Sequence, residues 1–160
     1  PCFFVDEHGE AFDEAPSPSD TFAGALLTVV DRSAKPVMFR EPLFSEDFLR
    51  NFSSLRQKLS DELGIETSVI SETPSRFSDE LWFRNREGWQ LRMSATVPPD
   101  KSIRALRLLF AKTLSESDRN NLDYIDLRTE NRIFYLSKGG EEKEEEKSVV
   151  VEGERKKKDR

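Results

Sequence analysis

The sequence predicts an α+β fold with a mostly antiparallel β-sheet and two amphipathic helices. Two segments repeat apolar residues at spacings of three and four, as helices with one buried face do. Several short runs rich in β-branched and aromatic residues alternate with polar ones, as half-buried strands do. Clusters of Gly, Pro, Asn and Asp separate these segments. A chain of 160 residues is also long enough to bury a core of its own.

The N-terminal part is predicted to begin with a hairpin. Residues 2–5 and 11–12 are apolar and flank the turn sequence 6–9, in which Gly9 can adopt a positive φ. The segment from Pro16 to Asp20 has the composition of a loop, and the apolar residues 26–30 are typical of a strand.

The clearest element is a helix that follows Ser45, which is placed to cap it. Glu46 and Asp47 follow in the first turn, where the helix dipole favours acidic side chains. Gly64 is placed to end the helix in the left-handed conformation. One apolar face is expected, made of Phe48, Phe52, Leu55, Leu59 and Leu63.

The second half is predicted to add a strand at 67–71 and a hairpin from 81–83 and 89–93. A second helix is expected from a cap at Asp100 to about Leu114. Two final strands, 122–128 and 132–136, are joined by residues 129–131. Because side chains alternate along a strand, Ile125 and Leu127 should face the core.

The last segment, residues 139–160, is predicted to be a disordered tail. It holds eight acidic and seven basic residues among twenty-two, and its only apolar cluster is residues 149–151. Such a composition cannot bury enough surface to offset the entropy lost on ordering. The folded domain is therefore expected to span residues 1–138.

Composition excludes several classes of function. A net charge of −6 argues against a nucleic-acid binder, which needs a basic face. The single Cys2 and the single His8 leave no disulfide framework and no cysteine- or histidine-rich metal site. His8 lies in a polar turn, and there is no glycine-rich phosphate loop. We predict no catalytic, cofactor-binding or metal-binding residues.

The strand at 132–136 is apolar on both faces, unlike a strand at a solvated edge. If it ends the sheet, its free amide and carbonyl groups could accept a strand from another protein. The alternative is that its own domain covers it. The residues alone do not choose between these possibilities.

The final two strands carry a resemblance to a known family. Residues 122–128, LDYIDLR, followed by 131–135, NRIFY, resemble the C-terminal signature of the FtsQ/DivIB family of bacterial cell-division proteins. Residues 4–12, FVDEHGEAF, resemble the family's opening strand–turn–strand, and the Gly88-Trp89-Gln90-Leu91 segment keeps the family's order. Around residues 35–38 the similarity is loose.

The resemblance implies a non-enzymatic divisome scaffold. Family members recruit FtsB (DivIC in Gram-positive species) and FtsL, and through them the septal peptidoglycan synthase complex. The last strands of their β domain accept a strand from FtsB. Carried onto this chain, the partner-binding residues are Tyr124, Arg128, Thr129, Asn131, Ile133, Phe134, Tyr135 and Leu136.

The resemblance also implies a single-pass protein of the cytoplasmic membrane, located at the division septum, with this domain outside. The family's cytoplasmic segment, transmembrane helix and POTRA domain do not occur in this sequence, so we expect a fragment of a longer protein. Two alternatives remain: a secreted or periplasmic α+β enzyme or ligand-binding domain, and a POTRA-like translocation module.

Overall fold

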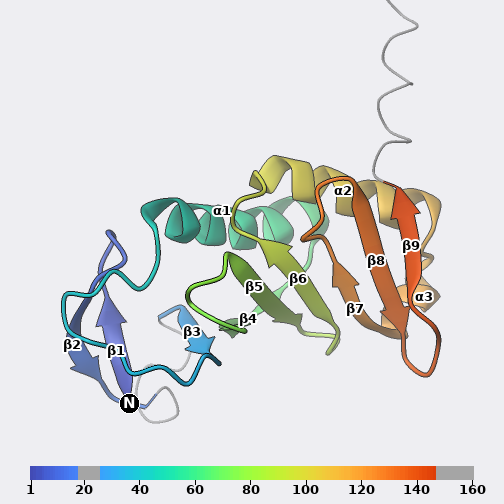
Figure 1. The fold of residues 1–160 in the computed structure, drawn as a ribbon. Coiled ribbons are helices and arrows are strands. Elements are labelled where there is room, and N and C mark those ends of the chain that lie inside the picture. The colour runs from blue at the N-terminus through green and yellow to red at the C-terminus, as the bar shows by residue number, and fades with distance from the viewer. Residues whose placement is uncertain (18–25, 147–160) are drawn as a thin grey trace, which may run out of the picture.

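The computed structural model describes residues 1–17 and 26–146, and the α+β prediction is confirmed. A two-stranded sheet pairs β1 (Cys2–Val5) with β2 (Ala11–Ala15), and it lies at one end of an elongated molecule (Figure 1). The main sheet follows it with seven strands in sequence order. The predicted N-terminal hairpin is therefore confirmed, whereas most of the predicted loop from Pro16 to Asp20 lies outside the described residues.

The main sheet contains two parallel and four antiparallel strand pairs. Its strands are β3 (Thr28–Asp31), β4 (Thr67–Thr73), β5 (Glu80–Asn85), β6 (Gln90–Ser94), β7 (Leu122–Asp126), β8 (Arg132–Ser137) and β9 (Lys143–Glu146). The two parallel pairs, β3–β4 and β6–β7, each enclose a helix in the chain, as parallel neighbours require.

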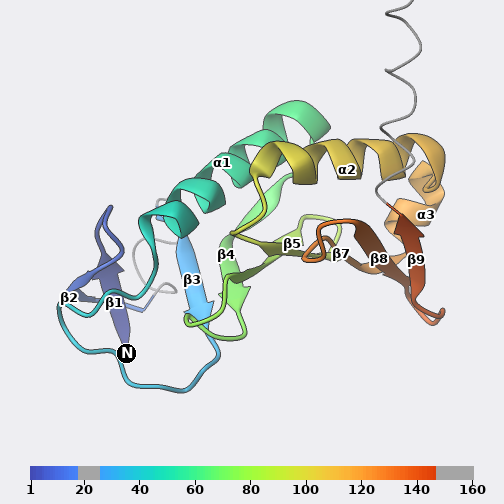
Figure 2. The ribbon, with the colours of Figure 1, turned by 45° about the horizontal axis from the view of Figure 1, so that its top comes forward.

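Both long helices cover the same face of this sheet (Figure 2). They are α1 (Glu46–Leu63) and α2 (Pro99–Lys112). The Ser45 hydroxyl accepts a hydrogen bond from the backbone N–H of Phe48, and Gly64 ends α1 with φ 65°, as predicted. The predicted cap at Asp100 is wrong: the cap position is Pro98 and α2 begins at Pro99, because proline fits the first helical position, where no N–H is needed.

A short third helix, α3 (Glu116–Asn120), was not predicted. Ser115 and Asp118 form a reciprocal capping box there, in which each side chain accepts from the other residue's backbone N–H. The helix buries none of its residues, so it has no apolar periodicity that could reveal it.

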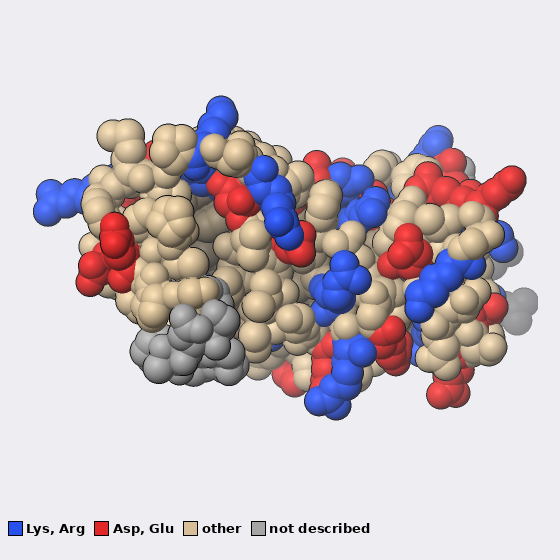
Figure 3. Space-filling view, turned by 90° about the horizontal axis from the view of Figure 1, so that it is seen from below, with Lys and Arg blue, Asp and Glu red and all other residues tan. Residues whose placement is uncertain are grey.

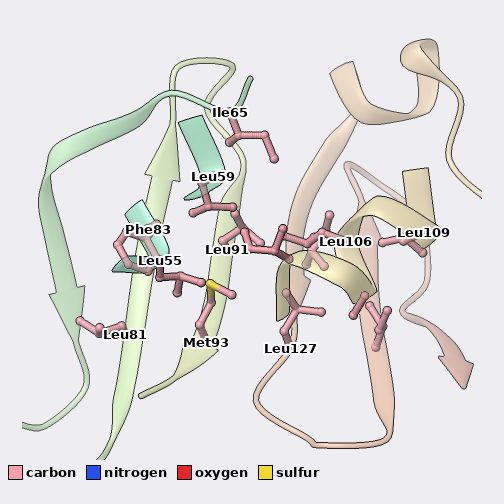
Figure 4. Close-up of a cluster of buried hydrophobic side chains, with 14 of the residues drawn as sticks. Leu55, Leu59, Ile65, Leu81, Phe83, Leu91, Met93, Leu106, Leu109 and Leu127 are labelled. Carbon is pink, nitrogen blue, oxygen red and sulfur yellow. The ribbon is translucent and has the colours of Figure 1, made fainter. Parts of the chain in front are cut away.

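The core lies between the two long helices and the sheet (Figure 4). Phe52 of α1 stacks on Phe83 of β5 with ring centroids 5.5 Å apart, and Phe110 of α2 makes a T-shaped contact with Trp89 beside β6. Ile125 and Leu127 are fully buried, as the alternation predicted. Among the described residues, no helix lies on the opposite face of the sheet (Figure 2).

An ion pair with a buried guanidinium fastens β3 and the connection that follows it. The Arg76 guanidinium lies 2.8 Å from the Asp31 carboxylate and also donates to the carbonyl oxygens of Lys35 and Pro36. Burial by itself would raise the pKa of Asp31, but hydrogen bonds from Arg76 and Ser33 outweigh it and lower that pKa to about 2.

The lowered pKa of Asp31 predicts a loss of stability in acid. A carboxyl with a folded pKa of about 2 and an ordinary value of 3.8 stabilises the fold fully above pH 4, by about 2 kcal/mol. That contribution disappears as the pH falls through 2. In urea unfolding, Asp31→Asn should therefore cost about 2 kcal/mol at pH 7 and almost nothing near pH 2. An equal cost at both pH values would contradict this.

The N-terminal hairpin docks through Gly9, whose φ is +85°. Its carbonyl oxygen accepts from the backbone N–H of Leu43 at 2.8 Å, and a Cβ at Gly9 would lie 1.9 Å from the carbonyl oxygen of Phe44. Backbone atoms cannot yield as a flexible side chain can. Only glycine therefore fits where the hairpin turn meets the segment that leads into α1.

Gly9→Ala should destabilise the hairpin more than a matched change at another positive-φ glycine. Gly88 has φ +93°, but a methyl group added there would have nothing within 4 Å, so Gly88→Ala isolates the backbone strain. That strain costs about 1–2 kcal/mol, and the clash at Gly9 should add about 1–3 kcal/mol. Urea unfolding of both variants measures the difference. Equal losses would mean that the Gly9 contact is not held in solution.

Candidate functional site: the C-terminal end of the sheet

The eight predicted partner-binding residues come together at one end of the main sheet. Tyr124 lies in β7, and Arg128, Thr129 and Asn131 lie in the connection that follows it. The other four lie in β8: Ile133, Phe134, Tyr135 and Leu136. β7 and β8 are antiparallel neighbours, with Tyr124 opposite Leu136, so the predicted set is one contiguous region.

Alternation along β8 divides its four residues between two faces. Ile133 and Tyr135 point toward the helices and are 4% and 5% exposed. Phe134 and Leu136 are half-buried on the opposite face. Burial raises the pKa of the Tyr135 hydroxyl, with further contributions from Glu145 and Asp118. The resemblance implies that Tyr135 binds a partner, but its ring is part of the core and leaves little side-chain surface for a partner to contact.

The face without helices carries a row of stacked side chains. The guanidinium of Arg92 lies 3.8 Å from the ring centroid of Tyr124 and 5.5 Å from that of Trp82. These residues occupy β5, β6 and β7, so the cation–π contacts run across three strands. Space-filling shows basic and acidic side chains interspersed on this side of the molecule (Figure 3). The face is mixed in charge, unlike a surface built for phosphates.

Arg128 is engaged within the domain. It donates to both carboxylate oxygens of Asp126, two residues before it, and lies 2.6 Å from the carboxylate of Glu80 in β5. Hydrogen bonding to Asp126, together with Glu80, outweighs burial and raises the pKa of Arg128. Asp126 and Arg128 thus pair with each other within the domain.

The edge of β8 is not open, because β9 pairs with it. Residues 132–135 lie opposite 143–146 in an antiparallel ladder. Arg132 and Glu144 form an ion pair of 2.6 Å, and the Tyr124 hydroxyl donates to Glu142, a bond that raises the pKa of Tyr124. The prediction of a disordered tail from residue 139 is therefore wrong for residues 143–146. The remainder, 147–160, lies outside the described residues.

β9 could not be predicted from the sequence, because lysine and glutamate have low strand propensity. Its residues are Lys143, Glu144, Glu145 and Glu146. The ladder with β8 supplies the pairing that these residues do not favour by themselves. The only local signal is the Gly139-Gly140 pair, since Gly139 adopts φ +71° in the turn between the strands.

Other candidates for chemistry lie apart from this region. His8 is exposed in its turn, as predicted, and its Nδ1 lies 2.7 Å from the Glu46 carboxylate, which raises the pKa of the imidazole. Cys2 is a free thiol. In the described part of the chain, no group of three or more His, Cys, Asp or Glu side chains could hold a metal ion.

A hollow of about 210 Å³ lies on the helix-free face of the sheet. Its lining comes from β4, β5 and β6, namely Ser68, Ile70, Glu72, Trp82, Arg84 and Gln90. It contains neither His8 nor Cys2, and the sequence did not predict it.

No helix within residues 1–17 and 26–146 has the length and apolar character needed to cross a bilayer.

No protein-family model matches the chain, and a search of curated proteins finds no match.

Removing Arg128 should leave the Asp126 carboxylate without its cation, although Asp126 is only 9% exposed. Arg128→Met is expected to cost about 2–3 kcal/mol of unfolding free energy, because an unpaired charge in a buried position is unfavourable. Adding Asp126→Asn should recover about 1 kcal/mol or more. Urea unfolding of Arg128→Met, Asp126→Asn and the double variant tests this. A double variant whose loss of stability equals the sum of the two single losses would contradict it.

Proposed function

We propose that this chain is the extracytoplasmic β domain of an FtsQ/DivIB-type divisome scaffold without enzymatic activity. It recruits FtsB or DivIC and FtsL, and through them the septal peptidoglycan synthase complex. The observation that most supports the proposal is the gathering of all eight residues predicted from the family signature at the C-terminal end of one sheet. The resemblance supplies the identity of the partners.

The chemistry of this end of the sheet supports partner binding through strand addition. A strand edge offers main-chain hydrogen bonds in a fixed register, and alternate side chains add specificity. Phe134 and Leu136 provide half-buried apolar surface beside Tyr124 on the helix-free face. Large apolar and aromatic side chains of this kind carry most of the free energy at protein interfaces.

The proposal places the domain on the outer side of the cytoplasmic membrane, at the division septum, with a single-pass anchor as in family members. The scaffold role needs no catalytic group. An enzyme would need polar side chains that converge on a reacting atom. The 210 Å³ hollow on the sheet face supplies Glu72 and Arg84 but lacks the histidine and cysteine of this chain.

Substitution of Phe134 tests the proposed site. Phe134→Ala should weaken binding of the FtsB- or DivIC-type ectodomain from the same organism by about tenfold, because an aromatic contact is lost. Ile70→Ala is the matched control: Ile70 is 42% exposed on the same face but lies in β4, on the other side of β5 and β6. Isothermal titration calorimetry measures both variants.

The proposal predicts unchanged affinity for Ile70→Ala. Absence of binding by the wild-type domain, or equal effects of the two substitutions, would contradict it. Circular dichroism of each variant confirms that the fold is retained, since the Phe134 side chain lies outside the helix–sheet core.

A further inference from the structure

The pairing of β9 with β8 is chemically mismatched. In the ladder Ile133 lies opposite Glu145, Phe134 opposite Glu144, and Tyr135 opposite Lys143. Three successive apolar residues of β8 thus face three charged residues. Directly opposed side chains are the units that stabilise a sheet, and apolar pairs do so better than an apolar side chain beside a charge.

The side-chain contacts that fasten β9 are exposed. Lys143 and Glu144 are exposed and Glu145 is half-buried, and none of them belongs to the hydrophobic core. The ion pair between Arg132 and Glu144 has about half of each side chain in solvent, where such pairs contribute little. The strand has only four residues, so few ladder hydrogen bonds hold it.

We propose that β9 is a displaceable cover that occupies the position of the partner strand on β8. The inference rests on the proposed function and adds what the partner strand must look like. That strand replaces β9, runs antiparallel to β8, and carries apolar side chains opposite Ile133 and Tyr135, where it borders the core. Between them, on the helix-free face, an acidic side chain in the place of Glu144 can meet Arg132.

The outer edge of β9 is a poor alternative docking position. Short length and charged side chains are the features by which proteins discourage strand addition at an edge. A strand added there would border Lys143, Glu144 and Glu145 and no apolar side chain of β9. Displacement brings the partner against Ile133, Phe134 and Tyr135 instead, which is the surface that distinguishes this edge.

Displacement makes affinity depend on how often β9 is open. Apparent affinity is reduced by the fraction of molecules in the competent state, so a weaker cover gives tighter partner binding. Glu145→Pro removes one backbone donor from β9 and should tighten binding of the FtsB- or DivIC-type ectodomain by about tenfold. Glu145→Val places an apolar side chain opposite Ile133, strengthens the cover, and should weaken the same binding severalfold.

Calorimetric titrations of the two full-chain variants separate the possible outcomes. Weaker binding by Glu145→Pro means that the partner adds to β9 itself, and overturns the inference. Unchanged binding by both variants means that β9 is not at the binding edge, and overturns it as well. If neither the wild type nor any variant binds, the proposed function has failed. Amide hydrogen exchange then tests separately whether β9 detaches from β8.

Hydrogen exchange needs no partner. Amides in the β8–β9 ladder should exchange at least about a hundredfold faster than those between β7 and β8, because opening of β9 breaks one short ladder and removes no β9 side chain from the core. Equal protection in both ladders would show that β9 is a permanent part of the sheet and would exclude displacement.

Discussion

The handedness of the two helical crossovers is the constraint on which the rest of the structure depends. β3, β4, β6 and β7 all run in one direction, and each crossover moves one position across the sheet in the same sense. Crossovers between parallel strands are nearly always right-handed, so equal handedness puts α1 and α2 on the same face. One face is therefore a continuous core, and the other is left for side chains that tolerate water (Figure 2).

This arrangement explains the different behaviour of the two ends of the sheet. At the β3 end, the chain before α1 is fastened by Arg76, whose guanidinium is almost completely buried and bonded to Asp31 and two carbonyl oxygens. At the β9 end, the described side chains make only surface contacts. The sheet thus has one edge closed by a buried network and one edge closed by an exposed acidic strand.

The sequence carried enough information for the elements that have a strong local pattern. The face of α1, its cap at Ser45 and the burial of Ile125 and Leu127 follow from periodicity, because the same periodicity creates the core. β9 has no such pattern, since its pairing depends on β8 rather than on its own residues. Alternation in β8 could have placed Tyr135 in the core, because Ile133, two residues earlier, shares its face.

The acidic edge strand also bears on how copies of this chain meet one another. A bare β8 edge, apolar on both faces, could pair with the same edge of a second molecule and begin an ordered aggregate. With β9 in place, two such edges would bring rows of glutamates together, and like charges repel. The charged residues of β9 thus disfavour the pairing of two copies through this edge, and the repulsion becomes weaker as dissolved salt screens the charges.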